Sequence, residues 1–499
     1  MSRRSVTAAE RRPARAWIAL VTDEFAPLTG PRGADDDWAP EDDARRPADD
    51  WTPEEDAPEP LTADGPIGWT GYDASRARAA ERTGADESVL YGLARVGGRP
   101  CVLVVFEFGF LGGSLGRAAG DRLVAAFRTA AERRLPLVSL VATGGSRMQE
   151  GMIALTQLQR VAAASVRLRA AGLPHLAVLR DPTTGGGWAT LGAAADLVLA
   201  LPAAQVAFAG SRVRPADADP AAYTAEDQHA HGHVDALVTP ERLRETLTLW
   251  LRLLSPDAAG HTASEPGDGA RAGAGPAPAP PPRALRDLPL PATGWEAVLR
   301  AREAGRPRAL AYLDGYFETR AAVSGDRAGG VDAGVECGFG IGPGGQVVAY
   351  AAQLGGATRP AGFRTAARLI GLADRLGIPV LTLIDTPGAA NDAEAERAGA
   401  GPAIAEVFGV IAGARVPVTS LLVGEGGSGG ALALAAPGGL WVTPDGYFSV
   451  IAPELAAQIL KRTPDRVPET AGQLRLRPQD LVDLGVARGI VGQHEAPSG

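Results

Sequence analysis

The second half of this chain repeats the first, and no other feature limits its possible folds as strongly. Residues 134–146 (RLPLVSLVATGGS) match residues 377–389 (GIPVLTLIDTPGA) at an offset of 243. Two further blocks follow in the same order: residues 172–187 match 415–430 at that offset, and residues 199–210 match 441–452 at an offset of 242. Three ordered blocks at a nearly constant offset predict two tandem copies of one fold.

Each copy has the same local pattern. Residues 120–134 and 361–376 place apolar side chains at three- and four-residue intervals, which predicts a helix. A proline and a short apolar run, LVSLVA or VLTLID, come next and predict a buried strand that ends in a glycine turn. Another helical segment then follows. This alternation predicts an α/β fold for each copy.

The length of 499 residues fits two domains of roughly 200 residues each. The run GARAGAGPAPAPPP between the copies is typical of a linker, and the acidic, proline-rich run from 33 to 59 predicts a disordered insert. We therefore expect a partly disordered acidic segment over 1–65, an N-terminal domain over 66–254, a linker over 255–290 and a C-terminal domain over 291–495.

Composition excludes several classes of protein. A formal net charge of −9 argues against a general nucleic-acid binder and against docking on an anionic membrane. Two cysteines, Cys101 and Cys337, are too few for a disulfide framework or a four-cysteine zinc site. The N-terminal apolar run AWIALV is too short for a signal peptide, and no apolar run reaches 18 residues. We expect a soluble, cytoplasmic protein.

The glycine turns are the candidate site. Each copy has two, at equivalent positions 41 residues apart, and a turn between a strand and a helix leaves backbone N–H groups without partners. Two such turns side by side have the geometry of an oxyanion hole, which predicts one anion site in each copy. The alternative is that the glycines only permit tight turns. The candidate residues are Gly144, Gly145, Gly185 and Gly186 in the first copy, and Gly388, Gly429 and Gly430 in the second.

Three other patterns are weaker. Residues 424–429 (GEGGSG) fit GxGxxG, but a dinucleotide fingerprint belongs in the first βαβ unit of its domain, and this match comes late. Residues 426–430 (GGSGG) fit the nucleophile elbow around Ser428, yet the only histidine downstream is His494, in a polar tail. The trio His229, His231 and His233 suggests a metal, but we interpret residues 232–235 as a structural turn and expect no bound metal.

At these turns the sequence resembles the carboxyltransferase component of bacterial acetyl-CoA carboxylase. Residues 108–116 (FGFLGGSLG), 142–155 (ATGGSRMQEGMIAL) and 179–191 (LRDPTTGGGWATL) are similar to its β subunit. Residues 384–407 (IDTPGAANDAEAERAGAGPAIAEV), 423–435 (VGEGGSGGALALA) and 447–460 (YFSVIAPELAAQIL) are similar to its α subunit, and residues 294–318 to the helical segment that leads into it. The chain resembles a fusion of the two subunits.

The resemblance implies two tandem crotonase-like (ClpP/crotonase) domains of repeated ββα units. It implies transfer of a carboxyl group from carboxybiotin on a carrier protein to acetyl-CoA or a related acyl-CoA, giving malonyl-CoA for fatty acid or polyketide synthesis. The N-terminal glycines would hold the thioester oxygen, and the C-terminal ones the ureido oxygen of biotin. In this family the active site lies at a dimer interface, between the N-terminal domain of one protomer and the C-terminal domain of the other.

The same resemblance bears on partners. No biotin-attachment motif and no ATP-binding carboxylase region are present, so the biotin carboxyl carrier protein and the biotin carboxylase of this ATP-dependent complex are expected as separate chains, with the protein itself a homodimer or larger homo-oligomer. The family's zinc ribbon is not expected, because no cysteine precedes Cys101. Arg147 and Arg397 are candidates for binding a substrate carboxylate or a CoA phosphate, and the alternative is that each forms a salt bridge on a helix surface or at an interface. Further arginine candidates near the motifs are Arg212, Arg214, Arg359, Arg364 and Arg462.

Two rival functions remain at this point. The same pair of anion holes would serve a decarboxylase of malonyl thioesters, because it is the reverse chemistry. A non-catalytic scaffold that retains the fold is the other alternative, although it would have little reason to keep glycines at all four turns. The sequence does not give the length of the acyl chain; the resemblance favours acetyl-CoA.

Overall fold

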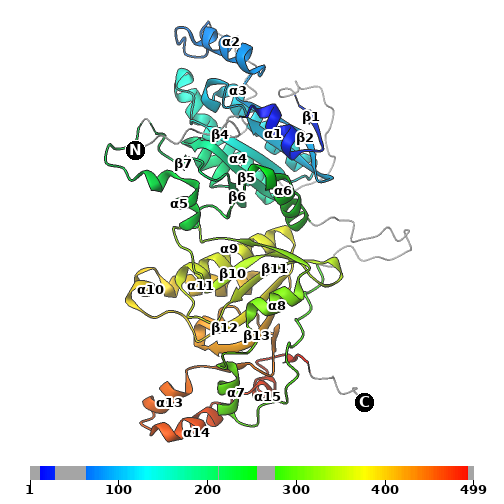
Figure 1. Ribbon diagram of the computed structural model, residues 1–499, viewed down its shortest axis with the longest axis vertical. Coiled ribbons are helices and arrows are strands. Elements are labelled where there is room, and N and C mark those ends of the chain that lie inside the picture. The colour runs from blue at the N-terminus through cyan, green and yellow to red at the C-terminus, as the bar shows by residue number, and fades with distance from the viewer. Residues whose placement is uncertain (1–11, 29–62, 212, 256–275, 493–499) are drawn as a thin grey trace, which may run out of the picture. The chain divides into compact units, whose positions relative to one another are not determined.

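The computed structural model describes residues 12–28, 63–211, 213–255 and 276–492. Contacts along the chain divide it into two compact units (Figure 1). The first comprises residues 1–227 and 237–248, and the second comprises residues 228–236 and 249–499. The chain thus crosses between the units more than once, so neither unit is one unbroken stretch of sequence.

One sheet runs through the first unit, in the order β1-β2-β3-β4-β5-β6-β8, with β7 pairing with β5. The pairs β1–β2 and β2–β3 are antiparallel, whereas β3 to β6 run parallel. Every residue of the central strand β4 is buried, as expected for a parallel strand with both faces covered. The strands are β1 (Glu24–Pro27), β2 (Val89–Val96), β3 (Arg99–Phe106), β4 (Leu137–Thr143), β5 (His175–Thr184), β6 (Leu197–Ala200), β7 (Val206–Ala207) and β8 (Ala236–Leu237).

The second sheet has the same topology, strand for strand. Its order is β9-β10-β11-β12-β13-β14-β16, with β15 pairing with β13, and its parallel part again begins at the third strand. The tandem repeat predicted from sequence is therefore confirmed as two copies of one fold. The strands are β9 (Thr319–Val323), β10 (Val335–Ile341), β11 (Val347–Gln353), β12 (Val380–Thr386), β13 (Val418–Gly427), β14 (Leu440–Val442), β15 (Tyr447–Ser449) and β16 (Gly489–Ile490).

The two sheets share one irregularity. The pairing of β4 with β5 shifts between Val141 and Thr143, and the pairing of β12 with β13 shifts between Ile384 and Thr386, which are the positions related by the offset of 243. A shift of this kind leaves extra residues on one strand and locally interrupts the ladder of hydrogen bonds. In both units it lies just before the glycine turns.

The helices follow the sequence pattern. α9 shows why: Pro360 occupies its first position, its buried side chains face the sheet, and it ends at Gly377, whose φ of 70° only glycine adopts without strain. None of the helices in the described ranges is both long and apolar enough to cross a bilayer. The longer helices are α1 (Ala14–Val21), α2 (Tyr72–Thr83), α3 (Arg117–Glu132), α4 (Gly151–Ala170), α6 (Pro240–Leu254), α7 (Gly294–Ala301), α8 (Ala309–Tyr316), α9 (Pro360–Leu376) and α11 (Ala400–Gly413). The shorter ones are α5 (Ala225–Ala230), α10 (Ala393–Arg397), α12 (Ser428–Leu432), α13 (Pro453–Ile459), α14 (Val467–Gln473) and α15 (Pro478–Asp483).

Part of the N-terminal segment is built into the first unit. β1 extends the sheet by pairing with β2, and α1 buries Trp17 completely. The acidic run at 33–59 lies outside the described residues. Of the linker, residues 276–290 are described and lie against the second unit, where Ala279 is buried in the core and its carbonyl accepts the Thr419 hydroxyl at 2.7 Å.

The burial of Trp17 gives a test of this arrangement. Replacing Trp17 by Ala should destabilise the first unit by about 3–5 kcal/mol, because a fully buried aromatic side chain leaves a large cavity. Denaturant unfolding of the whole chain measures the change. The control is Trp69→Ala: Trp69 is 44% exposed, so its loss should shift the transition far less. Equal effects of the two substitutions would contradict a structural role for α1.

Candidate active site

In the first unit the structure brings the two glycine turns together. Gly145 follows β4 with a φ of 105°, and Gly185 follows β5 with a φ of 63°. A Cβ added to Gly185 would lie only 3.1 Å from the Gly145 Cα. Neighbouring parallel strands end at the same edge of a sheet, so turns that follow them meet there. A side chain at Gly185 would press against the other turn, and one at Gly145 would be strained by the positive φ of that residue.

The second unit repeats this contact. Gly388 follows β12 with a φ of 138°, and a Cβ built on it would lie 3.2 Å from the Gly427 carbonyl oxygen. On the other turn, a Cβ on Gly430 would lie 2.2 Å from the Ala389 nitrogen. These approaches are between backbone atoms and leave no room for a side chain at position 430.

Several of the predicted glycines already use their N–H groups within the fold. The Gly144 N–H donates to the Gly112 carbonyl at 2.9 Å, and the Gly185 N–H to the Phe208 carbonyl at 3.0 Å. At the matched first glycines, Gly145 donates to the Thr143 hydroxyl at 3.0 Å and Gly388 to the Thr386 hydroxyl at 3.1 Å. These four glycines therefore shape the turns, and their amides are not the donors that face a ligand.

Other amides at the same turns have no partner. Within the described ranges, the N–H groups of Ser146, Gly186, Ala389, Gly429 and Gly430 donate to no protein group. Ser146 is held by bonds from its neighbours to Leu115, and Ala389 by equivalent bonds to Thr358.

These open donors occupy positions that the internal repeat relates. Ser146 and Ala389 are related by the offset of 243, and so are Gly186 and Gly429. Each unit therefore presents a matched pair of open donors, as an oxyanion hole requires. Ser146 and Ala389 are not among the glycines predicted from the sequence. The repeat does align them, because each follows the matched glycine of its turn, Gly145 or Gly388.

Ser428 occupies a strained position in the second unit. Its φ is 55°, in the left-handed region that non-glycine residues rarely adopt, and its counterpart at the offset of 243 is Gly185, with a φ of 63°. The backbone conformation is thus common to both units and is set by the turn. The GxSxG match around Ser428 is therefore explained by this shared turn. The overlapping GxGxxG match lies at the end of β13 and the start of α12, late in the sheet, so it is not a dinucleotide fingerprint.

Arg147 lies beneath the first turn with its guanidinium fully buried. It forms ion pairs with Glu87 and Glu150, and its Nη1 also donates to the Tyr72 hydroxyl at 3.0 Å. Its Nη2 donates to the Ser114 carbonyl at 2.8 Å. A side chain enclosed in this way does not present its charge to a CoA phosphate. We therefore assign Arg147 a positioning role, in which it fixes the loop that carries the Ser146 amide.

Arg147 holds the buried Glu87 carboxyl in its ionised form. Burial alone would raise the pKa of Glu87, but the hydrogen bond and charge of Arg147 outweigh it and keep that pKa below its usual range. Burial raises the pKa of the Tyr72 phenol, so it stays protonated and donates to Glu150. A neutral tyrosine and two carboxylates around one guanidinium form a fully bonded network.

The remaining predicted arginines divide into two groups. Arg397 is exposed at the end of α10 and stays a prediction. The others have protein partners: Arg214 stacks on Tyr223, Arg359 and Arg364 pair with Asp392 and Asp326, and Arg462 donates to Thr470, whereas Arg212 lies outside the described residues.

The histidine trio lies beside a structural turn. Asp235 is buried and pairs with Arg327 and Arg368 of the same unit, and the His229 Nδ1 lies 2.8 Å from the Val234 carbonyl oxygen. The described part of the chain contains no group of three or more acidic, histidine or cysteine side chains arranged for a metal ion.

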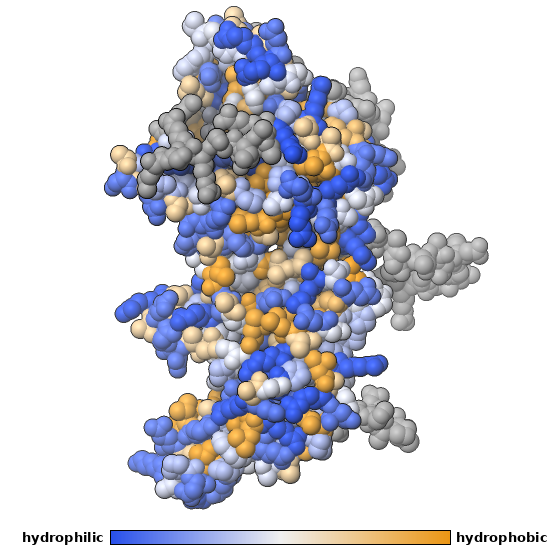
Figure 2. All heavy atoms as spheres, in the orientation of Figure 1, coloured by the Kyte–Doolittle hydropathy of each residue, from blue (hydrophilic) through white to orange (hydrophobic). Residues whose placement is uncertain are grey.

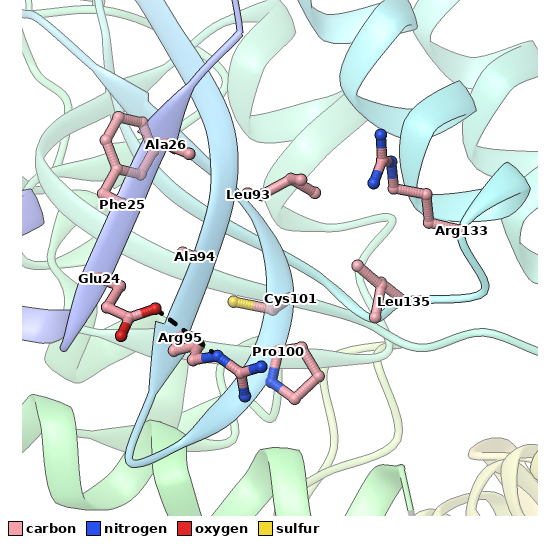
Figure 3. A pocket seen from close by; sticks show the side chains of 10 residues that line it. All are labelled: Glu24, Phe25, Ala26, Leu93, Ala94, Arg95, Pro100, Cys101, Arg133 and Leu135. Carbon is pink, nitrogen blue, oxygen red and sulfur yellow. Dashed lines mark ion pairs between the residues drawn. The ribbon is translucent and has the colours of Figure 1, made fainter.

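A pocket of about 590 Å³ lies elsewhere in the first unit (Figure 3). It opens between β1, β2, β3 and the end of α3, where the ion pair of Arg95 with Glu24 and the side chain of Arg133 surround an apolar floor. Leu135, which lines it, precedes β4, whereas the glycine turn follows that strand, so the pocket and the turns occupy opposite strand ends. Burial raises the pKa of the Cys101 thiol in its wall to about 12.

The fold is that of a carboxyltransferase with two crotonase-like domains. Residues 67–254 match a carboxyl transferase domain, and residues 288–498 match the acetyl co-enzyme A carboxylase carboxyltransferase-like family. The chain belongs to the acetyl-CoA carboxylase carboxyltransferase family, and it is an enzyme of carboxyl transfer. The alternative of a malonyl-thioester decarboxylase gains no support from these matches.

Individual relatives support the same family assignment. The acetyl-coenzyme A carboxylase carboxyl transferase subunits beta/alpha of Saccharopolyspora erythraea is 38% identical over 450 residues, which cover 85% of this chain and 76% of that protein. A probable biotin-dependent acyl-coenzyme A carboxylase beta3 subunit of Mycobacterium bovis is 35% identical, over 85% of this chain and 83% of that one.

Among solved structures, the hexameric transcarboxylase 12S with methylmalonyl-coenzyme A bound has the same fold. Its TM-score is 0.71 at 17% identity, with 97% of this chain and 87% of that chain covered. A single-chain, multi-domain long-chain acyl-CoA carboxylase gives a TM-score of 0.66 at 18% identity, over 96% of this chain and 46% of that one.

The buried charge of Arg147 can be tested by its removal. Replacing Arg147 by Met should lower the free energy of unfolding by about 3–5 kcal/mol, because Glu87 and Glu150 would remain buried without a compensating charge. The control is Arg128→Met, which removes an exposed ion pair with Glu132 and should change stability by about 0–1 kcal/mol.

The same pair of variants gives a pH dependence. Because the folded-state pKa of Glu87 lies below its ordinary value of 4.5, its pairing stabilises the fold above that pH and is lost as the pH falls below it. The difference in the free energy of unfolding between wild type and Arg147→Met should therefore shrink as the pH falls below 4.5, as followed by denaturant unfolding. A difference independent of pH would contradict the pairing.

Proposed function

We propose that this carboxyltransferase moves a carboxyl group from carboxybiotin on a separate carrier protein to acetyl-CoA, forming malonyl-CoA. The observation that carries the proposal is the pair of open amides in each unit: Ser146 with Gly186, and Ala389 with Gly429. Transfer between two carbonyl-type groups requires two places where negative charge on oxygen is stabilised, and two matched holes supply them.

The first hole is assigned to the acyl thioester. The Ser146 and Gly186 amides would donate to the thioester oxygen and stabilise the charge that it gains when the α-carbon loses its proton. Backbone amides fixed by strand ends do this with little reorganisation. Arg147 contributes by holding the Ser146 peptide through its contacts with Ser114 and Glu87.

The second hole is assigned to biotin. The residues there fit the group: the Ala389 and Gly429 amides are open donors for one oxygen, and, apart from the adjoining backbone of α12, no described protein atom lies within 4 Å of a Cβ built on Gly429, so there is space for a ligand. When bound, carboxybiotin supplies the carboxyl group and, after giving it up, a basic ring nitrogen. The chain itself binds and orients both substrates at fixed donors.

We propose that each active site takes one hole from each of two copies of the chain. Exposed apolar side chains at the turns support this. Met152 and Leu155 lie at the start of α4, which follows the first turn, and Leu432 follows the second in α12. Further exposed apolar side chains lie in and just before α13, namely Val450, Leu455 and Ile459. Figure 2 shows apolar residues among the polar ones there. Apolar surface of this kind favours a protein partner.

The finer assignments rest on the family names. Acetyl-CoA is favoured because relatives such as the protein of Saccharopolyspora erythraea carry it in their names, and malonyl-CoA would feed fatty acid or polyketide synthesis. A biotin carboxyl carrier protein and an ATP-dependent biotin carboxylase would then act as separate partners. Arg397, exposed on α10, remains a candidate for a CoA phosphate or a substrate carboxylate.

The decisive experiment is the reverse reaction in purified protein, with malonyl-CoA as substrate and acetyl-CoA formation as the readout, with and without free biotin. Turnover that requires biotin is the expected result. Turnover without biotin would overturn the proposal in favour of decarboxylation. No turnover in either case would contradict acetyl-CoA as the acyl group, and methylmalonyl-CoA is the next substrate to assay.

The second hole can be blocked without disturbing the fold. Gly429 has no left-handed φ and no neighbour within 4 Å of a built Cβ, so Gly429→Val should fold normally while its branched side chain occupies the space beside the open amides. We expect a loss of at least 100-fold in biotin-dependent turnover. The control is Gly371→Val, an equally open glycine on the exposed face of α9. Near-normal turnover of Gly429→Val would refute the assignment of this hole.

The dimer can be tested at α13. Ile459 is 70% exposed, and Ile459→Glu should shift the protein to a monomer and abolish biotin-dependent turnover, because a charge in an apolar interface is desolvated without a partner. Light scattering after gel filtration measures the mass. Val486→Glu, at an exposed apolar side chain of the same unit, is the control and should leave the mass unchanged. A monomeric wild type would contradict the shared site.

A further inference from the structure

The register shift of the second sheet contains a buried charge that the proposed mechanism does not use. Between the pairs Ile384–Leu422 and Thr386–Gly426, β12 contributes one residue, Asp385, where β13 contributes three. The ladder of backbone hydrogen bonds is interrupted there. Asp385 is completely buried, directly before the first turn of this unit.

The Asp385 side chain replaces the missing ladder bonds. Its Oδ1 accepts the Glu425 N–H at 3.1 Å and the Arg306 Nη2 at 2.5 Å, and its Oδ2 lies 3.4 Å from the Arg308 Nη1. The Arg306 Nη1 also donates to the Val423 carbonyl at 3.3 Å. The carboxylate therefore joins the end of β12 to the end of β13 through a buried guanidinium.

The backbone makes room for this cluster. A Cβ on Gly424 would lie 2.2 Å from the Arg306 Nη2, and a Cβ on Gly355 would lie 2.2 Å from the Arg308 Nη1. Each of these glycines therefore leaves space for one of the two arginines that surround Asp385. Arg306 itself is only 4% exposed, so its charge depends on Asp385 for compensation.

The first unit has the same register shift, but different side chains support it. At the offset of 243, Ala142 stands where the second unit has Asp385, and no carboxylate occupies that place. Instead, Arg180 of β5 donates its Nη2 to the carbonyls of Phe106 and Leu140, at 2.5 and 3.1 Å. The Asp385 cluster is thus specific to the unit that we assign to biotin.

We propose that Asp385, paired with Arg306, is the positioning residue of the second anion hole. Ala389 lies four residues beyond Asp385, and Gly429 lies four residues beyond Glu425, whose N–H Asp385 accepts. One carboxylate therefore fixes the two strand ends that carry the two open amides, and sets the separation between them. The inference rests on the proposed function of those amides, because it deepens the description of that same hole.

Asp385→Asn is the test, with Asp374→Asn as the matched control. Asp374 accepts the N–H groups of Arg415 and Val416 and pairs with Arg415, so it makes the same kinds of bond at the opposite end of β13. With malonyl-CoA and free biotin, we expect Asp385→Asn to lower kcat roughly 100-fold, with the KM for malonyl-CoA within twofold of wild type. Asp374→Asn should retain the wild-type kcat.

A second readout does not depend on activity. Hydrogen exchange followed by mass spectrometry should show faster exchange at both turns, residues 386–390 and 426–431, in Asp385→Asn, and unchanged exchange there in Asp374→Asn. If wild type itself lacks biotin-dependent turnover, the proposed function fails, while the exchange measurement still decides the positioning role. Exchange equal to wild type at either turn would overturn the inference.

A double variant separates positioning from stability. Asp385→Leu with Arg306→Met removes both charges, and replacing a buried ion pair by apolar side chains commonly restores stability. Positioning predicts that the double variant melts close to wild type and still has a kcat lowered roughly 100-fold. Recovery of stability and kcat together would show that the pair only supports the fold, and would overturn the proposal.

Discussion

The parallel pairing of two neighbouring strands, interrupted at one matched place, is the constraint on which the rest of this structure depends. β4 with β5, and β12 with β13, run in register until just before their carboxyl ends, where the pairing shifts. Beyond the shift, each strand ends in a turn and a helix begins. Because the strands are neighbours, the turns meet, and amides that would have continued the ladder are left open at Ser146 and Gly186, and at Ala389 and Gly429.

These amides can stay open because the polar groups of the residues around them have hydrogen-bond or ion-pair partners within the fold. The hydroxyls of the two threonines at the shift, Thr143 and Thr386, each accept the N–H of the glycine two residues further on, so that donor is used within the fold and the next amide along the chain is left open. Buried charges complete the support, through Arg147 with two carboxylates in one unit and Asp385 with Arg306 in the other. In the proposed function, backbone donors held in this way would stabilise the negative charge that develops on the ureido oxygen of biotin and on the thioester oxygen, while the carboxyl group moves from a ring nitrogen of biotin to the α-carbon of the acyl group.

Much of the fold was predictable from the sequence because the repeat and the apolar periodicity are local patterns. The helices at 120–134 and 361–376, and the strands LVSLVA and VLTLID, occur where the spacing of apolar residues predicts them. The donors were harder to predict. Gly145 and Gly388 stand out in the sequence, but they serve the turn geometry, whereas Ser146 and Ala389 carry the open amides and have no distinctive side chain. Arg147 presents the same difficulty, since a sequence does not show whether a charged side chain is enclosed.

By itself, the sequence determined the duplicated α/β architecture, the position of the two turns in each copy and the family of carboxyltransferases to which the chain belongs. These depend on residue types and spacings that persist along the chain. Only the tertiary structure decided which amides remain open and which charges lie beneath them. A backbone N–H is identical in every residue except proline, and its availability depends on which carbonyl or hydroxyl the fold brings within 3 Å of it.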